Sequence, residues 1–275
     1  MSRDEVIIEA GRADRNYWRD LWRYRELFYF FAWRDILVRY KQTVVGVAWA
    51  VIRPLMTIGI LTVVFNKVAH LQGPAAVPYA LLVCAGMLPW QFFSTALSEA
   101  GNSLVGNAHV ISKVYFPRLI VPAGSVITSF VDFLITLVIM AGMMACYGFL
   151  PDWRILFLPI FAGLAFCAAF GAGLWLSAVN VKYRDFRYVL PFVVQFGVYV
   201  SPVGFSTDSV PERWRLLFSF NPMVGVIDGF RWSLLRGHVD IWWPGLLVSG
   251  VFTVLLVSFG LWYFRRTERF FADVV

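Results

Sequence analysis

Long apolar runs separated by short polar connections make up most of this chain. The runs that are long enough to cross a bilayer as helices are 44–65, 77–97, 119–150, 155–179, 188–205 and 241–264. At about 1.5 Å per residue the first run gives a helix about 33 Å long, slightly longer than the roughly 30 Å hydrocarbon core of a bilayer. The pattern therefore predicts an all-α integral membrane protein with six transmembrane helices.

The third run, 119–150, departs from this simple pattern. It is the longest of the six, and Pro122 stands close to its start. Proline is tolerated in the first turn of a helix but interrupts a helix interior. We therefore expect this span either to tilt or to begin as a separate short helix.

The residues before the first span follow a helical period. Apolar and aromatic side chains recur there at steps of three and four, which is typical of one face of a helix. That face consists of Tyr17, Leu21, Tyr24, Phe28 and Phe31. We interpret 17–42 as one or two amphipathic helices in the cytoplasmic interface, with the aromatic side toward lipid and the arginines toward the headgroups. Docking of this segment on a partner protein is a second interpretation, and the two are compatible.

Basic side chains predict the orientation, because they mark the cytoplasmic ends of spans. Arg34, Arg39 and Lys41 precede the first span. With six spans both termini are cytoplasmic, and the remaining Lys and Arg residues lie more often inside than outside. The predicted organisation is a cytoplasmic amino-terminal segment at 1–43, a transmembrane domain at 44–265 and a cytoplasmic tail at 266–275.

A further apolar run, 216–235, is ambiguous. It contains Asn221, Pro222, Asp228 and Arg231, which are costly in lipid. Counting it as a seventh span would also reverse the charge balance across the membrane. The residues 206–240 are therefore predicted to form an external re-entrant or surface region, which is broken at Pro211 and at Asn221–Pro222, between spans five and six.

Composition supports the membrane assignment and narrows the chemistry. The chain is 59% hydrophobic and 18% aromatic, whereas a soluble domain is about 45–50% apolar. The net charge of +7 fits basic loops that face anionic lipid and does not point to nucleic acid. Cys84, Cys146 and Cys167 lie inside apolar runs and are expected to be free thiols. The sequence shows no metal-ligand spacing and no catalytic constellation, so we expect neither a metal site nor an enzyme.

Two connections that are cytoplasmic in this topology combine aromatic and basic residues. They read GNSLVGNAHVISKVYFPR at 101–118 and NVKYRDFR at 180–187. Aromatic residues and arginine dominate binding hot spots, so exposed Tyr115, Phe116, Tyr183 and Phe186 would suit a docking surface. Ordinary anchoring in the membrane interface is the alternative.

Arg53 and Asp132 are charged residues inside predicted spans. By helical rise they lie about 14 Å and 20 Å from the starts of their spans. A charge at such depth needs a partner or water. They are channel candidates that either pair with each other or, for Arg53, meet polar groups of a substrate. Alternatively, Arg53 extends to the cytoplasmic edge.

Several stretches together resemble the permease subunits of ABC-2 type polysaccharide exporters, which move O-antigen, capsule or teichoic-acid polymers. The stretches are RDILVRYKQTVVGVAWAVIRPL at 34–55, GMLPWQFFSTAL at 86–97, NSLVGNAHVISKVYFPRLIVP at 102–122, NVKYRDFRYVLPF at 180–192, and SPV with FNPMVGVIDGFRWSLL at 201–235. Arg53 departs from the resemblance, since a neutral residue is expected at that position.

The resemblance implies a homodimer in the bacterial inner membrane, served by two copies of a separate ATPase. The expected substrate is a polysaccharide or a lipid-linked glycan, as in lipopolysaccharide biosynthesis. The sequence contains no GxxxxGK[ST] motif for cradling nucleotide phosphates. We therefore expect no cofactor in this chain, with ATP and Mg²⁺ bound by the partner.

The resemblance also implies roles for particular residues. The ATPase-coupling residues are Arg34, Asp35, Arg39, Tyr40, Lys41, Gln42, Lys113, Tyr115, Phe116, Pro117, Arg118, Lys182, Tyr183, Arg184, Asp185, Phe186 and Arg187. An outer gate above the channel contains Pro202, Asn221, Pro222, Asp228 and Arg231. Asp228 and Arg231 stand three apart, so on a helix they share a face and could form an ion pair. A surface helix with a weak exposed ion pair is the alternative.

Two other functions remain open at this stage. One is an ABC-2 permease for a drug or lipid, which would have a similar architecture. The other is an ion-coupled secondary carrier with Asp132 as its proton site, although no inverted repeat is evident.

Overall fold

The structure is a computed structural model of the chain, and it describes residues 17–41, 44–68, 70, 74, 76–114, 116–183, 185–268 and 271. Within these residues it contains helices and turns and no strand, so the expected all-α architecture is confirmed there. In chain order the helices are α1 (Tyr17–Arg23), α2 (Arg25–Lys41), α3 (Val44–Thr62), the π-helix η1 (Val63–Val68), α4 (Tyr79–Gly106), α5 (Ala108–Ile111), α6 (Ile120–Cys146), the 3-10 helix η2 (Trp153–Phe157), α7 (Leu158–Lys182), α8 (Phe186–Val200), the 3-10 helix η3 (Thr207–Ser209), α9 (Glu212–Phe218), α10 (Pro222–Leu234) and α11 (Trp243–Glu268).

The apolar helices make the chain a multi-pass membrane protein. Among the described residues, the segments long and apolar enough to cross a membrane are Val51–Val68, Tyr79–Gly106, Ile120–Cys146, Trp153–Lys182 and Trp243–Thr267. The predicted fifth span corresponds to α8, which is apolar but only 15 residues long, about 22 Å. It ends at Val200, earlier than expected. Whether α8 crosses the membrane, which would bring the total to six spans, stays a prediction.

Two expectations about helix breaks can be compared directly with the structure. Pro122 lies in the first turn of α6, which continues unbroken, so the separate short helix is wrong. Proline fits this position because the N–H groups of a first turn have no intrahelical partner. The breaks at Pro211 and Asn221–Pro222 are confirmed, since these residues directly precede or begin α9 and α10.

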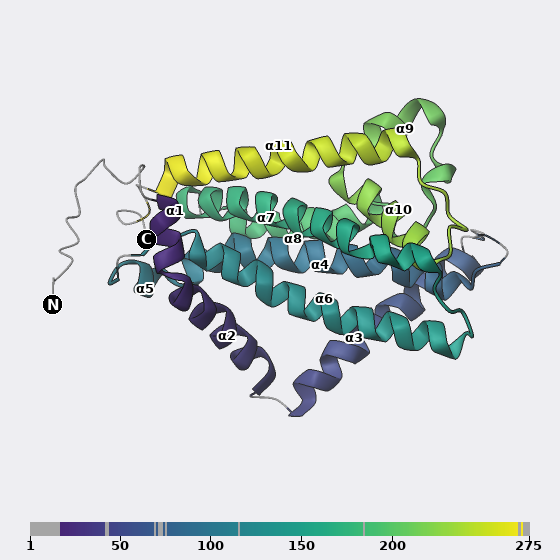
Figure 1. Cartoon of the computed structure of the whole chain (residues 1–275), viewed down its shortest axis with the longest axis horizontal. Coiled ribbons are helices and arrows are strands. Elements are labelled where there is room, and N and C mark those ends of the chain that lie inside the picture. The colour runs from purple at the N-terminus through teal and green to yellow at the C-terminus, as the bar shows by residue number, and fades with distance from the viewer. Residues whose placement is uncertain are drawn as a thin grey trace.

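Helix α4 is the centre of the bundle. It packs against α3, α6, α7, α8 and α10, and most of its side chains are buried. α4, α6, α7 and α11 lie side by side along the long axis of the molecule (Figure 1). α7 and α11 approach closely at Gly171 and Gly260, where an added Cβ on Gly260 would lie 2.2 Å from the Gly171 carbonyl oxygen. Glycine at such a crossing lets helix backbones come into contact within a membrane.

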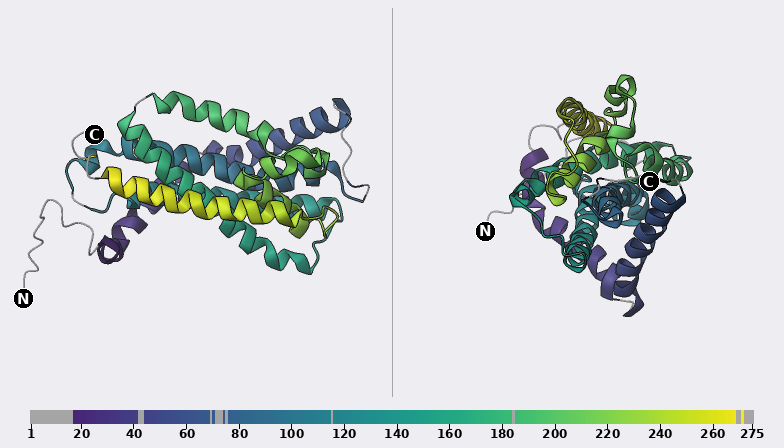
Figure 2. Two further views of the ribbon diagram at one scale, coloured as in Figure 1. Left: turned by 90° about the horizontal axis from the view of Figure 1, so that it is seen from above. Right: turned by 90° about the vertical axis from the view of Figure 1, so that its right-hand side faces the viewer.

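The helices α3 and α8 are the least covered by the rest of the chain. Only 6% of the segment Val51–Val68 is buried, and Leu190 is the one buried residue of the fully described α8. In both views of Figure 2, α8 and the later part of α3 with η1 lie on the same flank of the bundle. This flank is therefore open to lipid or to another chain.

The amino-terminal helices pack on the bundle through the predicted aromatic stripe. Tyr17 and Phe31 are buried, and Leu21, Tyr24 and Phe28 pack partly buried in the same cluster. The other buried members of this cluster are Leu104, Ile111, Phe116, Leu119, Ile120, Val121, Leu174, Ala178, Val181, Phe264 and Phe271. The expectation that the stripe faces lipid is therefore wrong, because the stripe fills a hydrophobic cluster at this end of the bundle.

The neighbouring residues Phe31 and Phe30 allow a matched test of this packing. Phe31 is 3% exposed and Phe30 is 59% exposed. Replacing Phe31 by alanine leaves a cavity and should destabilise the solubilised protein by about 3 kcal/mol, or about 10 °C in melting temperature. Phe30→Ala should leave the melting temperature nearly unchanged. Equal melting temperatures for the two variants would mean that α2 is not docked as described.

Candidate functional site

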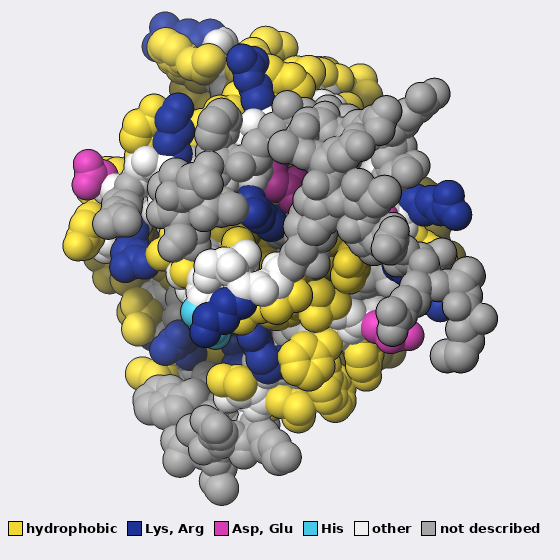
Figure 3. Space-filling view, turned by 90° about the vertical axis from the view of Figure 1, so that its left-hand side faces the viewer, with side chains coloured by type: hydrophobic (Ala, Val, Ile, Leu, Met, Phe, Trp, Pro, Cys, Tyr) yellow, Lys and Arg dark blue, Asp and Glu magenta, His cyan; other side chains and the backbone are white. Residues whose placement is uncertain are grey.

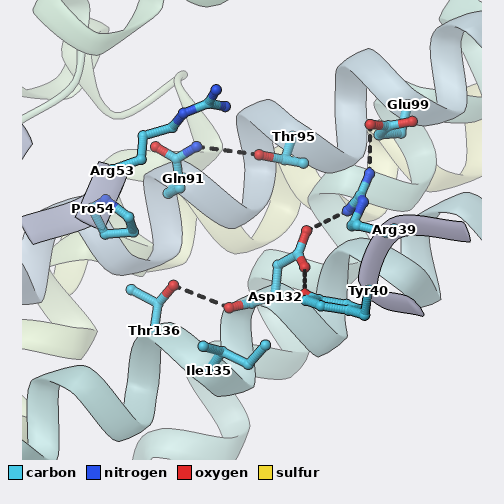
Figure 4. Close-up of a pocket in the computed structure, with 10 residues that line it drawn as sticks. All are labelled: Arg39, Tyr40, Arg53, Pro54, Gln91, Thr95, Glu99, Asp132, Ile135 and Thr136. Atoms are coloured by element: carbon cyan, nitrogen blue, oxygen red, sulfur yellow. Dashed lines mark hydrogen bonds and ion pairs between the residues drawn. The ribbon is translucent and has the colours of Figure 1, made fainter. Parts of the chain in front are cut away.

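A cluster of ion pairs joins the end of α2 to the membrane-crossing helices α4 and α6. The Arg39 guanidinium binds the carboxylate of Asp132 on α6 through Nη1. Through Nη2 it binds Oε1 of Glu99 on α4 at 2.6 Å. The Tyr40 hydroxyl donates a hydrogen bond to the second Asp132 oxygen. Figure 4 shows these side chains converging from three helices. The charge of Asp132 is therefore balanced by a residue from outside the membrane spans.

The tyrosine in this cluster acts as a donor. Burial raises the pKa of the Tyr40 phenol above its usual value, and its hydrogen bond to Asp132 and the charge of that carboxylate raise it further. The hydroxyl therefore stays protonated at physiological pH. Arg39 and Tyr40, both predicted as coupling residues, thus form one contact with Asp132, which was predicted as a channel residue.

Two cavities lie on either side of this cluster. The first, here called the Arg53 cavity, has a volume of about 310 Å³ and is lined by Arg39, Tyr40, Arg53, Pro54, Gln91, Thr95, Glu99, Asp132, Ile135 and Thr136. The second, the Arg34 cavity, has a volume of about 490 Å³ and is lined by Arg34, Asp35, Val38, Arg39, Glu99, Asn102, Ser103, Gly106, Asn107, Ser125 and Thr128. Arg39 and Glu99 line both cavities.

The expected pairing of Arg53 with Asp132 is wrong. Both residues line the Arg53 cavity, but Asp132 is bound by Arg39 and Tyr40. The guanidinium of Arg53 makes no ion pair with any residue that the structure describes. The cause is α2, which packs along α6 and places its own Arg39 against the Asp132 carboxylate.

Most of the residues that line the two cavities were not predicted from the sequence, although the spacing of polar residues on α4 and α6 indicates them. On α4 the polar residues Gln91, Thr95, Glu99 and Asn102 follow one another at steps of four, four and three. On α6 a second series at similar steps contains Ser125, Thr128, Asp132 and Thr136. Such spacing places each series on one helix face, and polar stripes of this kind in apolar helices indicate a cavity or a polar neighbour.

The end of the first connection lies beside α1 and is bonded to the end of α11. The backbone N–H of Arg118 donates to Oε1 of Glu268 at 2.8 Å, and the Arg118 guanidinium donates to the backbone carbonyl of Glu268. Burial raises the pKa of the Glu268 carboxyl and of the Tyr17 phenol beside it. α1, the start of α6 and the end of α11 therefore form one body at this end of the molecule.

Phe116 and Pro117 lie inside this body. Phe116 is 4% exposed and packs on the ring of Phe31, with centroids 5.7 Å apart. The expectation that Phe116 is exposed for docking is therefore wrong, because α2 covers it. Lys113 in the same connection is exposed. Arg34 links α2 to this region by donating to the Asn107 side chain at 3.0 Å, and it also pairs with its neighbour Asp35 on α2 at 2.7 Å.

The second connection carries the other predicted coupling residues. Lys182, Tyr183, Asp185 and Arg187 are exposed and Phe186 is half-buried. Just before them, Asn180 donates to the Gly101 carbonyl at 3.0 Å and to the Asn102 side chain at 3.1 Å. The end of α7 is thereby joined to α4. Figure 3 shows the end face of the molecule near these connections, where Lys and Arg side chains are spread among hydrophobic ones.

Some predicted coupling residues lie outside the described residues. These are Gln42, Tyr115 and Arg184, together with the side chain of Lys41.

At the opposite end, Arg231 of α10 is fully buried and binds backbone carbonyls. Its guanidinium donates to the carbonyl oxygens of Val203 at 2.7 Å, Phe205 at 2.7 Å and Leu82 at 3.3 Å. Gly86 of α4 makes room for it, since an added Cβ there would lie 2.8 Å from Nη2. Arg231 therefore fastens the segment after α8 to the central helix.

The ion pair expected between Asp228 and Arg231 is wrong, as is the alternative of an exposed pair on a surface helix. Both side chains are buried, but the two are not within ion-pair distance in this described region. Asp228 instead accepts a hydrogen bond from the Thr207 hydroxyl at 2.8 Å. Burial raises the pKa of the Asp228 carboxyl to about 6, against the lowering effect of nearby Arg231.

The other predicted gate residues shape the same region. Pro202 is buried. Asn221 caps α10 by accepting a hydrogen bond from the Met223 N–H at 3.0 Å, and its amide donates to Ser201 at 2.9 Å. Pro222 occupies the first position of α10, where its fixed φ suits the helix.

Charged and polar cavities beside membrane-crossing helices are typical of membrane transport proteins. Comparison with known families makes this specific. The family model described as ABC-2 type transporter matches residues 26–235, and the chain belongs to this family.

Similar proteins cover nearly the whole chain. An O-antigen export system permease protein of Klebsiella pneumoniae is 27% identical over 243 residues, which is 88% of this chain and 92% of that protein. A permease with the same description from Myxococcus xanthus is 23% identical, over 92% of this chain and 96% of its own length. A polysialic acid transport protein of Escherichia coli is 22% identical, over 86% of this chain and 91% of its own length.

Proposed function

We propose that this chain is the membrane-spanning permease subunit of an ABC transporter that exports a polysaccharide across the cytoplasmic membrane. The observation that carries this proposal is the match to O-antigen export permeases over almost the full length of both chains. The related polysialic acid transport protein extends the similarity to another polysaccharide. The polymer is a glycan such as O-antigen or capsule, in free or lipid-linked form.

The proposed topology has six spans with both termini in the cytoplasm. α8 is the short fifth span, α11 is the sixth, and the segment from η3 to α10 between them lies on the outside. In support, α1 and the end of α11 meet at one end of the bundle, where the Arg265 guanidinium lies 4.8 Å from the centroid of the Tyr17 ring. Several Lys and Arg side chains lie on that end face, spread among hydrophobic ones (Figure 3), as expected of a cytoplasmic surface.

The energy source is a separate ATPase, which holds ATP and Mg²⁺ and binds the cytoplasmic end. The exposed side chains of the two connections provide the contact surface, including Lys113, Lys182, Tyr183 and Arg187. The partly buried contacts beneath them, such as Arg118 with Glu268, hold the flanking helices together. A stiff connection of this kind moves its helices as one body when the ATPase changes shape.

A second copy of the chain completes the conduit. The flank formed by α3 and α8 is largely uncovered, and α8 exposes Tyr188, Phe192, Phe196 and Tyr199 at steps of four, four and three. Gln195 is exposed beside them, which is costly against lipid alone. Two such flanks facing each other would enclose a path lined by aromatic rings. Above it, the segment held by Arg231 would form the outer gate.

Deletion of the gene tests the proposed function. Surface polysaccharide should disappear and return when this chain is supplied on a plasmid. It should not return when the partner ATPase is inactive, even with the proton gradient intact. Unchanged surface polysaccharide combined with altered drug sensitivity would indicate a permease for small molecules. Transport that persists without the ATPase but stops with an uncoupler would indicate an ion-coupled carrier.

A further inference from the structure

The Arg53 cavity and the Arg34 cavity form one polar groove. They share Arg39 and Glu99, and between them they extend from Asn107 in the first connection to Arg53 and Gln91. α2 and α3 form one wall, and α4 and α6 form the other. Each cavity has the size of a small-ligand site, which is commonly about 300 to 1,000 Å³. The groove is separate from the uncovered flank of α8.

The groove offers hydrogen-bond donors and acceptors along its length. α4 contributes Gln91, Thr95 and Asn102, and α6 contributes Thr128 and Thr136. Amide and hydroxyl groups both donate and accept. The bonds that they form within their own helices leave capacity for a ligand: Gln91 donates to Thr95 at 3.3 Å, and the Thr136 hydroxyl binds a backbone carbonyl.

The charges of the groove are balanced. Its arginines are Arg34, Arg39 and Arg53, and its acids are Asp35, Glu99 and Asp132. Arg34 is paired with Asp35, and Arg39 with both other acids. A phosphate or carboxylate ligand would therefore approach two carboxylates with only Arg53 available as a free cation among the described residues. Hydroxyl groups are not repelled by the carboxylates. They form hydrogen bonds with charged side chains that are at least as strong as those with neutral side chains.

We infer that this groove binds uncharged, hydroxyl-rich sugar units of the exported glycan. The inference rests on the proposed function and adds to it a location and a chemical class. The sugar units enter from the Arg34 cavity and reach the Arg53 cavity, where Arg53, Gln91, Thr95 and Thr136 hydrogen-bond to their hydroxyl groups. Arg39 lies between the two cavities, and its ion pairs hold the walls together.

Cysteine accessibility tests this inference. Thr95→Cys on α4 and Thr136→Cys on α6 place thiols on two different helices that line the Arg53 cavity, in a chain whose Cys84, Cys146 and Cys167 are replaced by serine. A small water-soluble methanethiosulfonate reagent is added to open membrane fragments that contain the whole transporter. The fragments come from cells that make the glycan and from cells that lack the first sugar transferase of its synthesis. Ser112→Cys, exposed in the first connection, is the matched control.

The expected result is that both cavity thiols react several-fold more slowly when the glycan is present, while the Ser112→Cys thiol reacts equally in both membranes. If both cavity thiols react equally fast with and without the glycan, in a strain where deletion of the gene still abolishes export, the groove does not bind the glycan. The proposed function would then still stand. Slow reaction in both membranes that is relieved by removing lipid would assign the groove to a lipid headgroup and overturn the inference. Cavity thiols that stay unreactive in both membranes, even after lipid removal, would also overturn the inference.

Discussion

Replacing Arg39 by alanine is expected to lower polysaccharide export at least about tenfold. Arg39 is the only described cation within ion-pair distance of Asp132 and of Glu99. Without it two carboxylates remain unpaired on membrane-crossing helices, and an unpaired charge near the centre of a span costs about 3 kcal/mol. Tyr40 would keep one hydrogen bond to Asp132 but supply no charge. The structure around α2 should loosen, and the groove should lose its shape.

Matched variants separate the ion pairs from general damage to α2. Arg25→Ala removes an exposed arginine at the start of the same helix, whose guanidinium stacks on Trp22, and should leave export near normal. Arg39→Lys should retain only part of the export activity, because a single ammonium group cannot bind two carboxylates with the forked geometry of a guanidinium. The neutral combination Arg39→Gln, Glu99→Gln and Asp132→Asn should restore the amount of protein in the membrane. Export would be measured as surface polysaccharide per transporter, and normal export by Arg39→Ala would refute the role of the cluster.

Replacing Arg231 by leucine is expected to prevent the protein from accumulating in the membrane. Three backbone carbonyls would lose their donor, and each unsatisfied buried group costs about 1 to 3 kcal/mol. Buried Asp228 would also lose its nearby cation. The sum is comparable with the whole stability of a typical domain, about 5 to 15 kcal/mol.

The measurement is the amount of folded protein and its melting temperature after extraction in mild detergent. Arg231→Lys should be intermediate, since one ammonium reaches fewer of the three carbonyls. Arg213→Leu is the control from the same region, because Arg213 is exposed on α9. A melting temperature for Arg231→Leu equal to that of Arg213→Leu would show that the buried guanidinium is not needed to hold the segment after α8.

The apolar pattern predicted the helices well because each span in lipid must satisfy its backbone N–H and C=O groups within its own helix, which is a local requirement. The breaks at Pro211 and Asn221–Pro222 were predictable for the same reason, since proline and a capping asparagine act on their own turn. The position of α8 was predictable too, but its length was not. Its last predicted turn became part of the segment that Arg231 binds, and that contact comes from a helix far along the chain.

The candidate site shows the opposite situation. Arg53 and Asp132 were recognised as charges that need partners, but the partner of Asp132 could not be deduced. Arg39 comes from a helix that was expected to lie flat in the interface, and only its packing along α6 brings the two together. Phe116 was misjudged for a similar reason, because its exposure depends on where α2 lies.

The sequence by itself determined that this is a helical membrane protein, where most of its helices begin and end, and to which family it belongs. The tertiary structure decided which charged and polar side chains meet: Arg39 with Glu99 and Asp132, Arg118 with Glu268, and Arg231 with the carbonyls beyond α8. The physical reason is the range of the interactions. Helix formation and membrane insertion depend on neighbours within a few turns, whereas ion pairs and buried guanidinium contacts depend on how distant helices pack.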